Sequence, residues 1–359
     1  VELAGWAYPG AVQRHIGFAQ TKWAYSAGAA LSACFALVGC ISFTVPSVRG
    51  GAIVVPEPSD LIRFARSRGG LGPSRPELCA VGGVGDAVLT VALALRAESA
   101  EREGAGVSTA TGVLLQSTPW ASQQKNRTST VSAGNLPSSV LDQYDKLAKT
   151  LPTRIRVSER KGKKGGVDEG KQPAEGIFIT TSTLRAFVAE NLARGLSWYD
   201  GFATAKTGVK KDLFVHYYKD RDNLGALYPE ERKGLTVMVE SQEGAERSFI
   251  RSVHAAVRAR FGAIASESSS VPATMKNRFG SERERWRLAF SGAKTPEQIR
   301  AALADLWSRG GSNPELRGNW ELILPLLRPE RWQEARDLAL VALASYKGQK
   351  PEEDEAVTA

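Results

Sequence analysis

The sequence predicts an α+β fold, with a mixed α/β N-terminal domain containing antiparallel strands (residues 1–245), an all-α C-terminal helical bundle (246–346) and a disordered tail (347–359). Short β-branched runs bounded by Pro and Gly indicate strands in the first part. From residue 246 onward, apolar residues recur at the three- and four-residue spacing of amphipathic helices. The tail carries Glu352-Glu-Asp-Glu355 and is too polar to pack.

The composition indicates a soluble globular protein with a basic surface. The 359 residues are 42% hydrophobic and 24% charged, with a net charge of +9 that favours polyanionic partners such as nucleic acid. The longest apolar run, residues 27–42, is too short to span a bilayer, so we expect no membrane association and a cytoplasmic location. The chain opens at Val1 without a signal peptide, and we expect that residues before it are missing.

The sequence contains no recognisable catalytic or metal-binding pattern. Its three cysteines and three histidines stand in no metal-ligand spacing, and no G-x-S-x-G motif or nuclease-like pair of carboxylates is present. Scattered thiols are typical of a reducing compartment. We therefore expect no cofactor, no metal and no enzymatic activity, although residues distant in sequence could still converge.

Strands and helices alternate in the first part of the chain. Ala52–Val55 is short and β-branched and is followed by Pro56, which predicts a strand. Ser59 or Asp60 can cap a helix over Leu61–Arg68 that glycines then end. A second helix is predicted over Ala87–Glu101, after a glycine-rich turn.

The polar stretch Ser117–Thr130 lies between two predicted strands, Val107–Gln116 and Thr128–Ala133, and is expected on a long hairpin or at a sheet edge. One interpretation is a solvated hairpin connection. The other is a nucleic-acid contact, since Gln and Asn can read base edges, Arg and Lys can meet phosphate, and an indole can stack on or wedge a base step. The candidate residues are Trp120, Gln123, Gln124, Lys125, Asn126 and Arg127.

A basic, glycine-rich tract follows a predicted helix over Ser138–Thr150 and an outer strand over Arg154–Val157. The tract, Arg160–Lys171, is expected to be poorly ordered without a partner. It is either a solvated loop or a source of salt-dependent phosphate affinity through Lys161, Lys163 and Lys164.

Another helix is predicted to begin at Ser182 or Thr183 and to end at Gly195. After it, Phe214–Tyr218 and Leu235–Val239 are predicted as strands because they are rich in aromatic and β-branched residues.

The helical part is predicted to contain five helices, over Glu246–Ala265, Pro272–Ser291, Thr295–Arg309, Leu316–Leu327 and Pro329–Tyr346. Thr295-Pro-Glu-Gln298 combines an N-cap, a proline in the first turn and a capping-box glutamine. Two apolar faces are expected to form the bundle core. Their residues are Ile299, Leu303, Leu306 and Trp307, and Trp320, Ile323, Leu324 and Leu327.

Positive charge is concentrated in the first two of these helices. Residues 246–292 contain nine basic and four acidic residues. Arg247, Arg251 and Arg258 recur at helical spacing and share a face that could follow a phosphate backbone. Lys276 and Arg278 complete the set of candidate nucleic-acid-binding residues.

Several phrases of the chain resemble a known family. They are Leu114-Leu-Gln-Ser-Thr-Pro-Trp-Ala-Ser-Gln-Gln-Lys125, Phe290-Ser-Gly-Ala-Lys-Thr-Pro-Glu-Gln298, Ala304-Asp-Leu-Trp-Ser-Arg-Gly-Gly-Ser-Asn313 and Ala335-Arg-Asp-Leu-Ala-Leu-Val-Ala-Leu-Ala-Ser345. They are similar to the large subunit of a type I CRISPR Cascade, in the myxococcal DevT-like subtype. The likeness runs from about Trp6 to Tyr346 and is most specific in the helical half.

The resemblance implies a non-catalytic role in a crRNA-guided complex. Such subunits recognise the protospacer-adjacent motif in target double-stranded DNA, stabilise the R-loop and the displaced single strand, and recruit the helicase-nuclease. Some end in a bundle that resembles the Cascade small subunit. The implied partners are crRNA, target DNA and the other Cascade subunits. On this basis the polar stretch would enter the motif duplex, with Trp120 or a glutamine as strand wedge, and the arginine face would hold the displaced strand.

Other functions remain open from the residues alone. One alternative is a subunit of a CRISPR-guided transposition complex, whose partners would be transposition proteins. A second is a DNA-processing enzyme with dispersed catalytic residues, which metal-dependent cleavage by the isolated chain would reveal. A third is a scaffold whose basic surfaces meet acidic proteins, and it would bind its partners without DNA.

Overall fold

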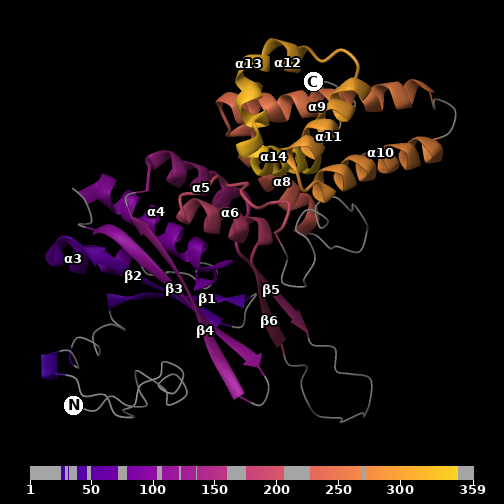
Figure 1. The fold of residues 1–359 in the computed structure, drawn as a ribbon. Helices are drawn as coiled ribbons and strands as arrows, with labels where there is room; N and C mark the ends of the chain where they lie inside the picture. The colour runs from indigo at the N-terminus through magenta and orange to yellow at the C-terminus, as the bar shows by residue number, and fades with distance from the viewer. Residues whose placement is uncertain are drawn as a thin grey trace, which may run out of the picture. The chain divides into compact units, whose positions relative to one another are not determined.

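The computed structural model describes the backbone of residues 26–28, 31, 39–46, 50–71, 79–102, 107–120, 123–134, 136–159, 175–205, 227–267 and 272–346. The chain divides into two compact units. Figure 1 shows the strands and the helices that form them. The first unit contains the described residues up to Leu141 together with Thr153–Thr181 and Leu192–Gly195. The second contains Asp142–Pro152, Ser182–Asn191 and the described residues from Leu196 onward.

The predicted α+β class is confirmed, because antiparallel strands occupy the first part of the chain and helices alone follow residue 227 among the described residues. The predicted domain boundary between residues 245 and 246 lies within α9 (Gly244–Glu267) and stays a prediction.

A four-stranded antiparallel sheet organises the first unit. Its strands are β1 (Ile41–Val45), β2 (Gly50–Pro58), β3 (Val107–Trp120) and β4 (Gln123–Gly134), and they lie side by side in chain order. Buried and exposed residues alternate along β1, as expected for a sheet with one covered face. The predicted strand at Ala52–Val55 is therefore confirmed as the middle of β2.

Helix α4 (Val84–Arg102) covers the buried face of this sheet, and α3 (Leu61–Leu71) packs beside α4. The glycine at position 112 of β3 permits the close approach of α4, because a Cβ there would collide with the side chains of Val84 and Val88. Asp60 caps α3 as predicted, since its Oδ1 accepts the N–H of Ile62 at 2.9 Å.

The polar stretch Ser117–Thr130 lies on the β3–β4 hairpin at a sheet edge, as predicted, but most of it is paired strand rather than connection. The ladder continues to the pair Trp120 and Gln123, and β4 is the last strand of the sheet. The prediction of shorter strands was wrong because ladder hydrogen bonds come from the backbone, so polar side chains do not end a strand that has a paired neighbour.

A helix, a two-stranded sheet and another helix follow. Helix α5 (Ser138–Thr150) has the predicted bounds, and β5 (Arg154–Glu159) pairs with β6 (Glu175–Thr180). Helix α6 (Thr183–Ala193) is followed by Gly195, whose φ of +71° suits a residue without a Cβ. The basic tract Arg160–Lys171 lies outside the described residues, as does the predicted strand Phe214–Tyr218.

Helices packed around α14 (Trp332–Ser345) form most of the second unit. They are α8 (Leu227–Glu240), α9, α10 (Pro272–Gly292) and α11 (Pro296–Arg309). Ten residues of α14 are buried, so this helix is covered on all sides. Buried Asp337 accepts the backbone N–H groups of Gly201 and Ala203 at 2.8 and 3.1 Å, which compensates the burial of its charge.

Leu235–Val239 is helical, and the prediction of a strand there was wrong. The segment forms the last turns of α8, where Leu235, Met238 and Val239 bury one face. Their spacing of three and four residues fits a helix, and packing against α14 outweighs the β-propensity of the valines.

The predicted helix Leu316–Leu327 is broken into three short elements, α12 (Pro314–Gly318), α13 (Trp320–Ile323) and the 3-10 turn η3 (Leu324–Leu327). Ile323 and Leu326 are buried, whereas Trp320 and Leu324 are 42% and 50% exposed. The prediction that Trp320 and Leu324 belong to the core was therefore wrong. The change from an α-helical to a 3-10 period at the proline in η3 turns a different set of side chains inward.

Candidate nucleic-acid interface

Helix α9 presents one apolar and one basic face. Its buried residues, which include Phe249, Val253 and Val257, pack into the second unit. Arg247, Arg251 and Arg258 are exposed. On an ideal helix these three positions lie within about 40° of one another, about 6 and 10 Å apart along the axis. The prediction that they share a face is confirmed, because all three line the same cavity.

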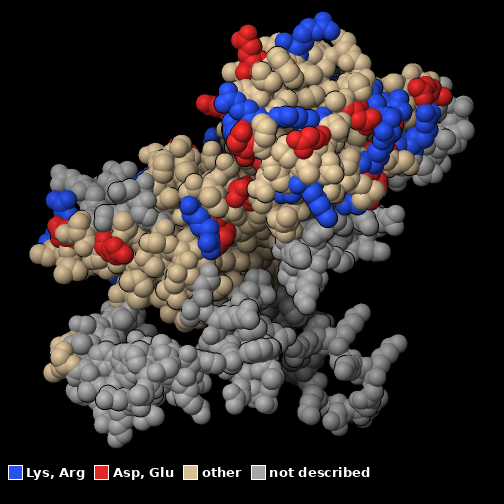
Figure 2. Space-filling model, in the orientation of Figure 1, with Lys and Arg blue, Asp and Glu red and all other residues tan. Residues whose placement is uncertain are grey.

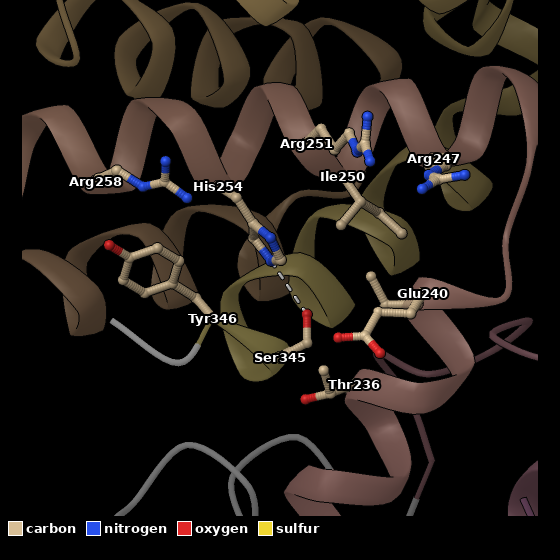
Figure 3. A pocket seen from close by; sticks show the side chains of 10 residues that line it. Thr236, Glu240, Arg247, Ile250, Arg251, His254, Arg258, Ser345 and Tyr346 are labelled. Carbon is tan, nitrogen blue, oxygen red and sulfur yellow. Dashed lines mark hydrogen bonds between the residues drawn. The ribbon is translucent and has the colours of Figure 1, made fainter. Parts of the chain in front are cut away.

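This cavity, of about 250 Å³, lies within the second unit. Helix α9 supplies one wall, the end of α8 supplies a second, and the last residues of α14 supply the third. Its lining consists of Thr236, Val239, Glu240, Arg247, Ile250, Arg251, His254, Arg258, Ser345 and Tyr346. Figure 3 shows Arg258, His254, Arg251 and Arg247 in this order along α9, with Tyr346 near Arg258 and Glu240 toward the other end.

His254 joins the cavity wall to α14. Its Nε2 lies 2.9 Å from the carbonyl oxygen of Ala342 and 3.2 Å from Oγ of Ser345. A carbonyl oxygen only accepts, so Nε2 carries a proton. Burial lowers the pKa of His254 to about 4, and the charge of Arg258 contributes to this decrease. The hydrogen bond to Ala342 acts in the opposite direction and raises the pKa. The ring is therefore neutral at pH 7 and holds its place as a hydrogen-bond donor.

Tyr346 closes the cavity at the Arg258 end. Its ring packs edge-on against His254 at a centroid distance of 5.6 Å. Burial raises the pKa of the Tyr346 hydroxyl, while Arg258 and Arg283 oppose the rise. Tyr346 is thus a neutral hydrogen-bonding group beside a guanidinium. Glu240 is the single carboxylate of the lining, so the cavity has three cationic side chains and one anionic side chain.

Most other arginines of the second unit are neutralised by neighbouring carboxylates, and Figure 2 shows Lys and Arg interspersed with Asp and Glu over its helices. The paired arginines are Arg260, Arg278, Arg285, Arg287, Arg309, Arg331 and Arg336. Within the described ranges, Arg247, Arg251 and Arg258 have no carboxylate within 4.0 Å. The cavity therefore brings together three guanidinium groups that are available to an external anion.

The remaining predicted site residues are not brought to this cavity. Arg278 on α10 forms a 2.6 Å ion pair with Glu267. Lys276 lies on the same helix, and only its backbone is described. Lys161, Lys163 and Lys164 lie outside the described residues.

The predicted hairpin residues lie at the tip of β3 and β4, where the backbone register pairs Trp120 with Gln123, Pro119 with Gln124 and Thr118 with Lys125. Asn126 and Arg127 follow along the edge strand. The hairpin belongs to the first unit and the arginine cavity to the second. The two groups of candidate residues therefore belong to different units of the chain.

Sequence reasoning missed the cavity residues other than the three arginines. His254 could have been found, because it lies three residues after Arg251 and four before Arg258 on the same face of a helix. Glu240 and Tyr346 could not, since only packing brings α8 and the end of α14 against α9.

The chemistry of the cavity is that of anion binding. Guanidinium groups donate several hydrogen bonds in a planar fork that matches phosphate oxygens. Among the residues that the structure describes, no group of three His, Cys, Asp or Glu side chains is arranged to hold a metal ion. No helix in the described part of the chain is long and apolar enough to cross a membrane.

Two comparisons with known proteins agree with the predicted resemblance. Residues 238–359 match the DevT C-terminal domain. This range includes the arginine face of α9, which is formed by Arg247, Arg251 and Arg258. The chain is also 51% identical over 348 residues to the CRISPR-associated protein Cas8a1/Csx13 of Myxococcus xanthus (strain DK1622). This alignment covers 96% of the chain and 60% of the length of that relative. The predicted resemblance to the DevT-like subtype is confirmed.

Proposed function

We propose that this chain, a homologue of DevT-like Cas8 proteins, is a nucleic-acid-binding part of the large subunit of a type I CRISPR effector complex. The observation that carries the proposal is the α9 cavity. Three guanidinium groups without a carboxylate partner among the described residues line it, inside the segment that matches the DevT C-terminal domain. In this role the arginine face holds phosphates of the strand that guide pairing displaces.

A guide-directed complex needs only limited sequence recognition from its protein. Base pairing with crRNA reads most of the target, so the protein reads a short adjacent motif and then stabilises the R-loop by charge. We assign motif recognition to the β3–β4 hairpin, where Gln and Asn can contact base edges and Trp120 can act as a wedge. The hairpin is suited to this task because it extends from a four-stranded sheet.

The proposed partners are crRNA, target double-stranded DNA, the displaced strand, the other Cascade subunits and a helicase-nuclease that the complex recruits. In this scheme the chain works in the cytoplasm and binds without catalysing a reaction. A binding role is supported by the chemistry of the cavity, where three arginines surround a neutral histidine held by α14. This arrangement favours retention of an anion over proton transfer at neutral pH.

The arginine face is tested by measuring R-loop binding at several salt concentrations with the complex that contains this chain. Arg251→Ala and Arg258→Ala should each weaken binding and reduce the slope of log K against log salt by about one unit. Arg285→Ala is the matched control, because Arg285 is ion-paired with Asp305. A salt slope that stays unchanged in both test variants would contradict the phosphate contact and favour a protein interface.

The hairpin is tested separately with the double substitution Gln123→Ala/Gln124→Ala. We expect binding to targets with a correct adjacent motif to fall toward that of targets with a scrambled motif, because base-edge contacts typically contribute about 1–3 kcal/mol each. Binding to a target whose strands are already separated should be unaffected. Full discrimination between the two motifs by the variant would remove the hairpin from motif recognition.

A further inference from the structure

The unpaired arginines of α9 raise the question of what neutralises them when no nucleic acid is bound. Glu240 is the cavity's own carboxylate, and no nitrogen of Arg247 or Arg251 lies within 4.0 Å of it. Guanidinium groups gathered on one face repel one another and favour a nearby anion. The described residues of the bundle do not supply that anion.

The chain itself carries an acidic segment that follows the cavity residue Tyr346 closely in sequence. Tyr346, which lines the cavity, is followed by only five residues before the run Glu352-Glu-Asp-Glu355. Four carboxylates in succession match three guanidinium groups in sign and approximate number. The run lies in residues 347–359, outside the described residues.

The connecting chain is long enough for a direct contact. Six residues beyond Tyr346 can span about 20 Å when extended. The eleven residue steps of α9 from Arg247 to Arg258 cover about 16 Å. Because Tyr346 lies near Arg258 at one end of this face, the acidic run can reach each arginine without any change in the bundle.

We infer that Glu352–Glu355 of this chain bind the arginine face of α9 and compete there with the phosphates of nucleic acid. The inference rests on the proposed function for the identity of the competitor, but the contact between segment and face stands without it. A short covalent connection provides an effective concentration in the millimolar range, so even a weak ionic contact is substantially occupied.

Such competition would sharpen selectivity for the intended nucleic acid. A strand that makes one or two phosphate contacts gains little once it must displace the acidic segment. A strand that follows the whole arginine face displaces it at a small relative cost. Non-specific binding is thereby weakened more than binding to an opened target.

The contact is tested first without nucleic acid. A fluorescent peptide of residues 350–357 is added to the full chain in which Glu352, Glu353 and Glu355 are changed to Gln and Asp354 to Asn. The peptide should bind at low salt, and Arg251→Ala/Arg258→Ala should weaken its binding at least fivefold. Arg285→Ala should leave its binding unchanged. Peptide binding that is absent, or that ignores the α9 substitutions, overturns the inference.

The competition is tested with a single-stranded oligothymidine at low salt. Neutralising the four carboxylates should tighten binding three- to tenfold, and the gain should disappear in the Arg251→Ala/Arg258→Ala background. An equal gain in both backgrounds overturns the competition, since it would reflect net charge alone. A gain that grows with protein concentration assigns the acidic segment to a second copy and overturns the intramolecular contact.

The two assays separate the two hypotheses. If the peptide binds the α9 face but neither form of the chain binds oligothymidine, the proposed function fails and the contact stands. If DNA binding depends on Arg251 and Arg258 while the peptide does not bind, the inference fails and the proposed function stands.

Discussion

The neutral state of His254 should make the second unit sensitive to acid. In the unfolded chain this imidazole titrates near its ordinary pKa of 6.5, whereas burial and the charge of Arg258 lower the folded pKa to about 4. Between these values the unfolded state binds the proton more tightly, so falling pH favours unfolding. A difference of roughly two and a half pKa units corresponds to about 3 kcal/mol. The stability associated with this residue should be lost progressively from about pH 7 down to about pH 4.

The assay compares the unmodified chain with His254→Gln. Glutamine can still donate a hydrogen bond toward the carbonyl oxygen of Ala342 but does not titrate. Urea unfolding is followed by tryptophan fluorescence at several pH values from 7 to 4. Carboxylates that protonate over this range are present in both proteins, and so are the other charged groups facing the ring, Arg247, Arg251, Arg258 and Glu240. Their contributions should largely cancel in the difference.

We expect the stability advantage of the unmodified chain over His254→Gln to decrease by about 3 kcal/mol between pH 7 and pH 4. The reasoning would be refuted by two unfolding profiles that remain parallel to within about 1 kcal/mol over this range, since His254 would then titrate alike in the folded and unfolded states.

Three further predictions concern packing and buried polar groups. Gly310→Ala should destabilise the chain by about 1–3 kcal/mol, because the added Cβ would lie 2.7 Å from Cα of Ala256. Gly262→Ala should instead stabilise the chain by about 0.5–1 kcal/mol, because this glycine lies inside a helix with open space around it. Thermal unfolding that shifts both variants in the same direction would contradict this pair of predictions. Glu231→Gln should lower the urea midpoint of unfolding by the equivalent of about 1–2 kcal/mol. The carboxylate accepts the first two N–H groups of α6 at 2.9 and 3.0 Å, whereas an amide offers only one oxygen. An unchanged midpoint would argue against this cap. Trp286→Ala should cost about 3–5 kcal/mol in chemical unfolding, because it leaves a large cavity in the core. Trp286→Phe should cost far less, because the buried indole N–H has no hydrogen-bond partner among the described residues, and equal costs would be inconsistent with the packing described.

Features set by residues close together in sequence were predictable. Thr295 caps α11 as expected, since its Oγ1 accepts the N–H of Gln298 at 3.4 Å. The glutamine side chain returns to the N–H of Lys294 at 2.7 Å, one residue earlier than the standard capping box. The shared face of Arg247, Arg251 and Arg258 was predictable for the same reason, because a single helix determines it.

Features that depend on long-range contacts were not predictable in the same way. The β-propensity of the valines in Leu235–Val239 indicated a strand, but α14 provides an apolar surface that fits a helical face instead. Trp320 was expected in the core, but it lies in the short helix α13 before a 3-10 turn and is 42% exposed. In both cases neighbours far away in sequence, or a local change of helical period, decided which side chains were buried.

The sequence by itself determined the α+β class, the position of most helices, the basic face of α9 and the resemblance to DevT-like proteins. These features follow from periodicity, capping and local identity, which act over a few residues. Only the tertiary structure decided that the basic face borders a cavity, that His254 is neutral, and that Tyr346 lines the same cavity as the arginines. Those features arise from the burial of α14 among the helices that surround it, because burial alters pKa values and joins residues that are almost a hundred positions apart.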